Sequence, residues 1–204
     1  MTNVIAIIDY GMGNLRSVEK AFEKLGFDVA VSSDPMFIDR ADGIILPGVG
    51  AFADCMSNLI SAGLEKAVYD GIESGKPFLG ICLGLQLLFQ ESEEDGIHKG
   101  LGIFKGRVRR LPKGRKIPHM GWNQIKYVNK SPIFNGVPEG SHFYFVHSYY
   151  VDPVEKDVIS TVTDYGLEFT SSVWSGNIFA VQFHPEKSGD IGLKVLENFG
   201  RLCK

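Results

Sequence analysis

Two polar side chains interrupt an otherwise apolar stretch, FLGICLGLQLLF, which covers residues 78–89. They are the thiol of Cys82 and the amide of Gln86. Gly80 and Gly84 flank the cysteine in a G-x-C-x-G pattern, typical of the sharp strand-to-helix turn that exposes a nucleophile. Such a cysteine lies at the positive end of the new helix, which favours the reactive thiolate. The alternative is that Cys82 is a small buried hydrophobic residue, as most free cysteines are.

A cysteine nucleophile needs a base, and the base needs a partner that orients it. His184 follows an apolar, strand-like stretch, and Pro185 holds it in an extended conformation. Glu186 is within reach of the imidazole and can fix its tautomer and stabilise its charged form. Cys82, His184 and Glu186 therefore predict a catalytic triad. The remaining histidines fit loops, strand ends or hydrogen-bonded structural positions and are not assigned to catalysis: His98, His119, His142 and His147.

The elements that must position these residues alternate along the first half of the chain, which predicts a doubly wound, mostly parallel α/β sheet flanked by helices. Hydrophobic periodicity places strands at 4–9, 28–32, 43–46 and 78–81, and helical pattern at 15–25, 51–74 and 83–90. Gly26 and Gly75 are placed to end two of these helices.

Strand patterns dominate the second half and are expected to extend the sheet and to add antiparallel strands. They cover residues 102–111, 122–128, 143–151, 158–165 and 177–183. An amphipathic helix at 191–202 should pack back on one face of the sheet. A single domain spanning residues 1–204 accounts for the whole pattern.

Composition points to an ordinary globular protein. The 204 residues are 44% hydrophobic and 22% charged with a net charge of -3, so the basic excess of a nucleic-acid binder is missing. The apolar run at 4–8 is too short for a signal peptide or a membrane span, so a cytoplasmic protein is expected. Cys55, Cys82 and Cys203 show no metal-ligand or disulfide spacing. Arg16 stands where a dinucleotide loop needs its third glycine, and neither a metal nor another cofactor is expected.

The motifs resemble those of the class I (triad) glutamine amidotransferases, whose G-x-C-x-G-x-Q elbow and His-x-Glu pair match residues 80–86 and 184–186. Within this family the likeness is greatest to the glutaminase subunits of imidazole glycerol phosphate synthases. It is carried by GMGNLRSV, LPGVGAF, PHMGWN, YFVHSYYV and FHPEKS and runs nearly end to end. The resemblance implies that Cys82 attacks the side-chain amide of glutamine, and that glutamate and ammonia are the products.

The resemblance also assigns residues to the substrate. Gln86 would help to hold glutamine, with a solvent-facing helix residue as the alternative. Ser148 and Tyr149 would lie near the carboxylate of glutamine. For the ammonium group we suggest Glu94, although it belongs to an acidic run of the kind that is usually solvated.

An oxyanion hole generally has two N–H donors, and the N–H of Leu83 supplies one of them. The turn PGVG at 47–50 follows a buried strand and so reaches the same edge of the sheet. The family suggests the N–H of Val49 as the second donor, and Gly48 and Gly50 leave that peptide free to rotate. A plain turn is the alternative.

Ammonia made in bulk water is mostly protonated and unreactive, so a synthetic glutaminase implies a partner that receives it under cover. The resemblance names a cyclase subunit with a (β/α)8 barrel, forming a heterodimer that serves histidine biosynthesis. The docking face is expected around the mouth of the site, with exposed aromatic anchors. It would include Asn14, Met120, Trp122, Tyr144 and Lys187.

Other interpretations stay open on the sequence alone. Trp122 and Tyr144 would be core residues if the docking face lay elsewhere. The basic run at 105–116 fits either a solvated hairpin or partner docking. The chain could also be an amidotransferase subunit of another pathway, a stand-alone γ-glutamyl cysteine hydrolase, or a binding subunit that has kept the fold, although the complete triad argues against the last.

Overall fold

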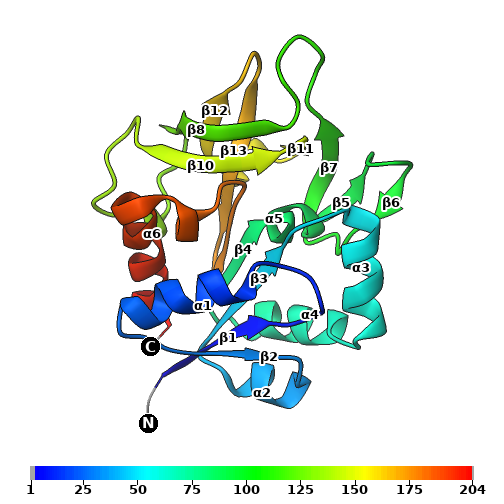
Figure 1. Ribbon diagram of the computed structural model, residues 1–204. Coiled ribbons are helices and arrows are strands. Elements are labelled where there is room, and N and C mark those ends of the chain that lie inside the picture. Colours follow the sequence, from blue (N-terminus) through cyan, green and yellow to red (C-terminus); the bar gives the residue numbers. More distant parts are fainter. Residues whose placement is uncertain (1–2, 204) are drawn as a thin grey trace.

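The structure is a computed structural model that describes residues 3–203 (Figure 1). Its centre is a mixed β-sheet whose first part is parallel, in the strand order β2-β1-β3-β4-β14. The bounds of these strands are β1 (Val4–Ile8), β2 (Asp28–Ser32), β3 (Gly43–Gly48), β4 (Phe78–Cys82) and β14 (Ile178–Val181). The expected doubly wound α/β architecture is confirmed.

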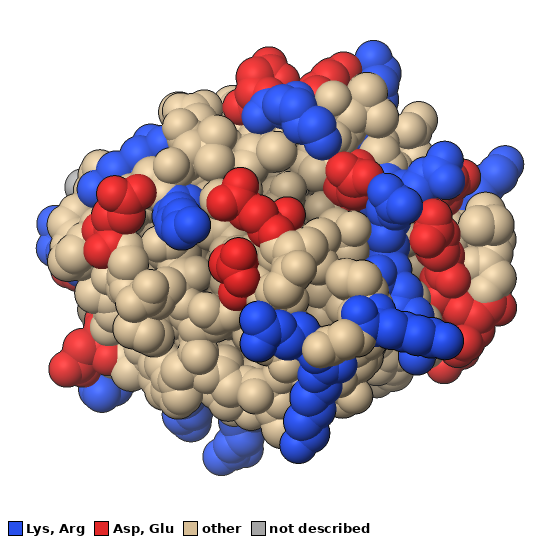
Figure 2. All heavy atoms as spheres, turned by 90° about the horizontal axis from the view of Figure 1, so that it is seen from above, with Lys and Arg blue, Asp and Glu red and all other residues tan. Residues whose placement is uncertain are grey.

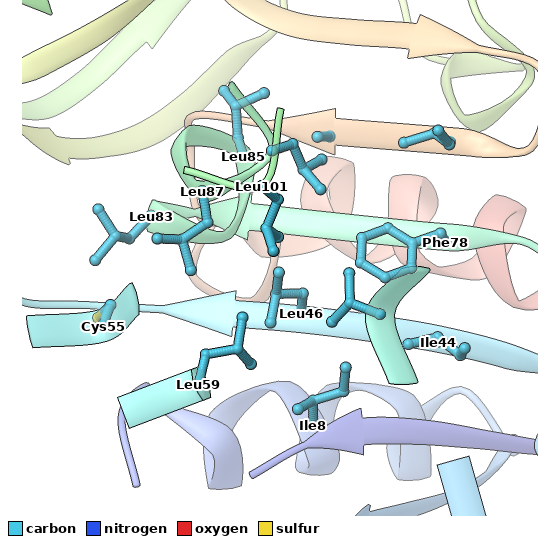
Figure 3. Close-up of a cluster of buried hydrophobic side chains, with 14 of the residues drawn as sticks. Ile8, Ile44, Leu46, Cys55, Leu59, Phe78, Leu83, Leu85, Leu87 and Leu101 are labelled. Atoms are coloured by element: carbon cyan, nitrogen blue, oxygen red, sulfur yellow. The ribbon is translucent and has the colours of Figure 1, made fainter. Parts of the chain in front are cut away.

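Helices cover both faces of this parallel part because its central strands β1, β3, β4 and β14 are apolar on both sides. In β1, Ile5 and Ile7 pack toward α1 (Leu15–Lys24) and α6 (Gly189–Leu202), whereas Ala6 and Ile8 pack toward the opposite face. That face carries α2 (Pro35–Arg40), α3 (Phe52–Ser61) and α4 (Glu65–Glu73). Figure 3 shows its core, in which Leu46 lies near Leu59 of α3.

The second half of the chain extends the sheet with antiparallel strands, as expected. β13, β11 and β7 follow β14 in the sheet, and β5 then pairs parallel with β7. Two shorter strands, β12 and β9, pair beyond β13. The bounds are β5 (Phe89–Ser92), β6 (His98–Lys99), β7 (Phe104–Arg110), β9 (Lys126–Tyr127), β11 (Tyr149–Pro153), β12 (Ile159–Asp164) and β13 (Glu168–Ser175).

A separate two-stranded ribbon crosses the upper part of the main sheet in Figure 1, next to β12 and β13. It pairs β8 (His119–Gln124) with β10 (His142–His147) in antiparallel register. The single strand expected at 143–151 is therefore two strands, because the chain leaves the ribbon at Ser148 and enters the main sheet as β11. The strand expected at 122–128 is likewise divided between β8 and β9.

Two expected helices differ from the structure. The helical pattern at 51–74 forms α3 and α4 rather than one helix, because Gly63 adopts a φ of +68° between them. The helix expected at 83–90 is the short α5 (Leu83–Leu87), after which Phe89 enters β5 and packs against Phe104. Gly26 and Gly75 end their helices with positive φ angles, as expected. Among the described residues, no helix has the length and apolar character that a membrane crossing requires.

Candidate active site

Three neighbouring parallel strands bring the candidate triad and the PGVG turn to one edge of the sheet. β3, β4 and β14 are adjacent, and the carboxyl ends of parallel strands meet at the same edge. Val49 directly follows β3, Cys82 ends β4, and His184 lies three residues beyond the end of β14. Residues far apart in the sequence therefore meet because of strand order alone.

Cys82 occupies a strained turn between β4 and α5. Its φ of +55° and ψ of -108° are rare for a residue with a side chain. The turn packs so tightly on β3 that a Cβ at Gly84 would overlap the carbonyl oxygen of Leu46. A Cβ at Gly80 would lie 2.9 Å from the carbonyl oxygen of Gly84. Both flanking glycines are therefore required by the turn, as the sequence pattern predicts.

His184 and Glu186 form a buried pair. The Nδ1 atom of His184 lies 2.8 Å from Oε1 of Glu186, and both side chains are almost fully buried. Pro185 begins a short 3-10 helix (Pro185–Lys187) that turns the carboxylate back toward the ring. Ser188 fixes the backbone, because its hydroxyl donates to the carbonyl of His184.

The charge state of His184 follows from its neighbours. Burial opposes the charged ring, but Cys82 and Glu186, both close to the ring, outweigh it and raise the pKa of His184 to about 10. The Nε2 atom is buried without a hydrogen-bond partner among the described residues. At neutral pH His184 is therefore an imidazolium, and a positive charge close to the sulfur is the arrangement that favours an activated cysteine.

A cavity of about 270 Å³ opens above Cys82. The residues that line it come from both halves of the chain and include most of the site residues expected from the sequence. They are Val49, Gly50, Cys82, Leu83, Gln86, Glu94, Pro118, Val146, His147, Ser148, Tyr149 and His184.

The PGVG turn lies directly beside the cysteine. Gly48 is in register with Cys82 across β3 and β4, and a Cβ on Gly48 would approach Leu83 to 2.9 Å. Two side chains hold the carbonyls of this turn from below. The hydroxyl of Tyr10 donates to the carbonyl of Pro47 at 2.7 Å, and the thiol of Cys55 donates to the carbonyl of Val49 at 3.4 Å.

The acidic run is partly structural. Glu94 lines the cavity, and its Oε2 accepts the backbone N–H of Phe52 at 2.7 Å, at the start of α3. Glu91 and Glu93 instead form ion pairs with Arg107 on the neighbouring strand β7. Glu94 is therefore the residue of this run that the fold directs to the cavity.

An amide network lies beside Cys82. Gln86 is buried, which excludes the solvent-facing alternative, and its Nε2 donates to the carbonyl of Tyr149 and to Oε1 of Gln182, both at 3.1 Å. Gln182 in turn directs its Nε2 to the sulfur of Cys82 at 3.7 Å.

Two buried histidines hydrogen-bond to each other at the base of the ribbon. His119 Nδ1 lies 2.9 Å from His147 Nε2, and His147 Nδ1 lies 2.8 Å from the carbonyl oxygen of Tyr149. Burial lowers the pKa of His119 to about 4 and that of His147 to about 3. Both rings are thus neutral, and the expected structural, hydrogen-bonded surroundings of these histidines are confirmed.

Comparisons with known proteins agree with this geometry. The family model for glutamine amidotransferase class-I matches residues 6–202. The chain belongs to the class-I glutamine amidotransferase family. This confirms the family expected from the elbow and the His-x-Glu pair.

The amidotransferase is also similar to relatives named imidazole glycerol phosphate synthase subunit HisH. It is 58% identical to the one from Moorella thermoacetica, over 98% of this chain and 95% of the relative. It is 57% identical to the one from Aquifex aeolicus, over 97% of this chain and 96% of the relative. These relatives belong to the group that the longer motifs indicate.

Solved structures share the fold. A structure described as PurLQS from Thermotoga maritima aligns with a TM-score of 0.78 at 22% identity and covers 100% of both chains. A crystal structure of a glutamine amidotransferase aligns with a TM-score of 0.78 at 20% identity, over 98% of this chain and 99% of that chain. At these identities the likeness supports the architecture alone.

The expected docking residues of the amidotransferase lie near this edge. Met120 and Trp122 of β8 are 60% and 56% exposed, and Trp122 packs edge-to-face against the half-buried Tyr144 of β10. The alternative that Trp122 and Tyr144 are core residues is therefore excluded. Lys187 is exposed and Asn14 is half-buried at the start of α1.

Both signs of charge occupy the top of the amidotransferase, where Figure 2 shows basic and acidic side chains next to one another. Three of the seven basic side chains of the run at 105–116 are paired. Arg107 contacts two glutamates, and Arg109 lies 3.0 Å from Asp152. Lys105 likewise lies 3.1 Å from Glu155. These pairs fit the interpretation of the run as solvated. The expected hairpin is wrong, because β7 pairs with β11 and β5 and residues 111–116 form no strand.

Six residues at the site were not expected from the sequence. Pro118, Val146 and His147 line the cavity, whereas Tyr10, Cys55 and Gln182 contact the turn or the cysteine. Gln182 had a signal, because it is a lone amide in an apolar strand, two residues before His184 and therefore on the same side of the chain. Tyr10 and Cys55 had none, because their contacts with the PGVG turn depend on how β1 and α3 pack around β3.

Proposed function

We propose that this chain is the glutaminase subunit of imidazole glycerol phosphate synthase, which hydrolyses glutamine and supplies ammonia to a cyclase. The observation that carries the proposal is the buried His184–Glu186 pair beside a cysteine on a strained elbow that opens into a cavity. The high identity to the HisH relatives over nearly their full length supports the choice of synthase.

The first half of the reaction forms a thioester. The thiolate of Cys82 adds to the amide carbon of glutamine, and the carbonyl oxygen becomes an oxyanion. The N–H groups of Leu83 and Val49 stabilise this oxyanion, with Gly48 and Gly50 giving the turn its freedom to present the second donor. The C–N bond then breaks, and the leaving nitrogen takes the proton of the His184 imidazolium to depart as ammonia.

The second half releases glutamate. Neutral His184 takes a proton from water, and the resulting hydroxide adds to the thioester carbon. The C–S bond then breaks, which releases glutamate. The Cys82 thiolate and the His184 imidazolium are restored. Glu186 holds the ring so that Nε2 is directed to the reacting atoms throughout, and it stabilises the charged ring.

The cavity supplies groups for the ends of glutamine. Gln86 lines it with an amide whose nitrogen is already used internally, which leaves Oε1 to accept from the substrate amide. Ser148 and Tyr149 would bind the α-carboxylate, and Glu94 would bind the α-ammonium. The carboxylate of Glu94 is fixed on one side by Phe52, which positions it without a large entropic cost.

The partner we propose is a cyclase with a (β/α)8 barrel that combines the ammonia with a ribulosyl-phosphate intermediate. The products are imidazole glycerol phosphate and an aminoimidazole carboxamide ribotide, within histidine biosynthesis in the cytoplasm. The barrel would dock in a heterodimer over Asn14, Met120, Trp122, Tyr144 and Lys187, because these residues surround the edge where ammonia is released.

Separating ammonia production from its use tests the proposal. With the cyclase present, Cys82→Ala should abolish glutamine-dependent synthesis of imidazole glycerol phosphate, while added ammonium salts should still support it. Cys203→Ala is the matched control, because Cys203 is also a buried cysteine but lies at the end of α6. A glutamine-dependent rate that survives in Cys82→Ala would contradict the assignment.

The same assay separates the alternatives. A stand-alone γ-glutamyl hydrolase would release glutamate at its full rate without the cyclase. An amidotransferase subunit of another pathway would hydrolyse glutamine but would not be stimulated by this cyclase. We expect low activity of the isolated subunit and strong stimulation by the cyclase loaded with its acceptor.

A further inference from the structure

Gln182 is a fully buried amide that the mechanism above does not use. Its exposed fraction is 0%, and its neighbours along the chain are apolar except for the reacting histidine two residues on. A buried amide is costly unless its hydrogen bonds are made, and an apolar side chain would fill the same space. Its presence therefore calls for a function of its polar groups.

The direction of its hydrogen bonds is fixed by a backbone carbonyl. The carbonyl of Tyr149 can only accept, so the Gln86 atom that lies 3.1 Å from it must be the amide nitrogen. That nitrogen also lies 3.1 Å from Gln182, so the Gln182 atom facing it must be the oxygen. The NH₂ group of Gln182 therefore faces the sulfur of Cys82, at 3.7 Å.

We infer that Gln182 is a further functional residue of the glutaminase reaction: its amide N–H donates to the sulfur of Cys82 and stabilises the thiolate. Hydrogen bonds to a charged acceptor are about twice as strong as neutral ones, so the donor favours the thiolate over the thiol. Gln86 has a second role in this arrangement, because it orients the Gln182 amide. The inference rests on the proposed function for its role in turnover.

Gln182 lies outside the cavity, so its effect on the reaction can be distinguished from an effect on substrate binding. Of the described residues, those that line the cavity do not include Gln182. It therefore has no direct contact to offer the substrate. Loss of its donor should lower kcat and leave KM within about threefold, whereas loss of a substrate contact would raise KM.

The reactivity of Cys82 toward iodoacetamide, followed by mass spectrometry of the peptide that contains it, tests the inference without glutamine. Gln182→Met keeps the volume of the side chain and removes the donor. At pH 7 its alkylation rate should fall about 10-fold, and the pH midpoint of alkylation should rise, because a hydrogen bond to a charged group is lost. Gln182→Glu keeps an oxygen for Gln86 but replaces the donor, and it should lower the rate at least as much.

Ser171→Ala is the matched control, because Ser171 is fully buried on β13 next to Gln182 and its side chain bonds to Thr161. It should keep the alkylation rate within about twofold of the unmodified protein. Circular dichroism establishes that each variant is folded. If Gln182→Met does not fold, the alkylation rate of Gln182→Glu tests the inference instead.

An unchanged rate and pH midpoint in a folded Gln182 variant would overturn the inference, whatever happens to turnover. If instead the variants lose alkylation as expected but the unmodified complex does not hydrolyse glutamine, the proposed function fails and the inference about the thiolate stands.

Discussion

The His119–His147 pair makes the stability of this protein depend on pH. His147 Nδ1 must carry a proton, because it faces the carbonyl of Tyr149, so its Nε2 accepts. His119 Nδ1 then donates, and its Nε2 accepts from the Nδ2 atom of Asn123 at 3.2 Å. A proton added to either ring would place two N–H groups face to face. The folded protein therefore holds both rings neutral.

The sign and size of the effect follow from the two pKa values. Folding lowers the pKa of His119 to about 4 and of His147 to about 3, whereas the unfolded value is about 6.5. Their contribution to stability is complete above the unfolded value and is lost as the pH falls toward the folded ones. Each histidine loses about 1.4 kcal/mol per pH unit in that window, so lowering the pH from 7.5 to 5.0 removes about 2 kcal/mol per ring.

His184 changes stability in the opposite direction over the upper part of this pH range. Its folded pKa is raised to about 10, so its contribution is present below about 6.5 and is lost as the pH rises through the folded value. Its stabilising contribution therefore begins to fall above about pH 6.5, inside the range measured. The loss is common to the unmodified protein and to a His119 variant, so the difference between their two curves still reports His119.

Urea unfolding followed by circular dichroism between pH 5.0 and 7.5 measures the effect. His119→Gln removes one of the two rings. When the pH is lowered from 7.5 to 5.0, the variant should therefore lose about 2 kcal/mol less unfolding free energy than the unmodified protein loses. His142 is an exposed histidine on the same ribbon, so His142→Gln is the control. It tests whether any histidine-to-glutamine substitution changes the dependence of the unfolding free energy on pH. Parallel curves for His119→Gln and the unmodified protein would refute the reasoning.

Three further predictions concern the proposed site. Val49→Pro removes the proposed oxyanion donor and should lower turnover of the folded, cyclase-bound enzyme on the order of 100-fold, whereas Val49→Ala should be nearly silent in the same glutaminase assay. Trp122→Ala and Lys187→Ala should weaken cyclase binding in calorimetry, Trp122→Ala by about 30-fold, and unchanged affinities would mean that the docking face is misplaced. Gly84→Ala should destabilise the fold by about 3 kcal/mol or more in urea, because its Cβ overlaps Leu46, and a fully stable variant would contradict the packing described.

Much of the fold was accessible from the sequence because local signals agreed with the tertiary structure. The bounds of β2 matched, and glycines with positive φ ended helices where expected. β13 was missed because its sequence, EFTSSVWS, has few apolar residues, yet most of it is buried between β11, β12 and β14. α2 had a usable signal that was not read, since Asp34 caps the helix and Pro35 begins it.

The candidate site was predictable where chemistry and backbone coincide. Cys82 and His184 follow from the elbow and from the strand end, and the cavity joins them to residues that the family resemblance supplied. Their neighbours in space could not be read in the same way. The contact of Gln182 with Cys82 depends on the parallel pairing of β14 with β4, which brings together residues a hundred positions apart.

The ribbon connects the proposed docking face to the site. Trp122 and the half-buried Tyr144 form a cross-strand pair on the ribbon, and each lies three residues away from the histidine of its own strand, His119 and His147 respectively. His147 lines the cavity, and its hydrogen bond ends on the carbonyl of Tyr149, which also accepts from Gln86. The ribbon and the amide network beside the cysteine therefore share one backbone carbonyl. A shift of β10 on docking would change the position of that carbonyl, and with it the amides that surround the nucleophile.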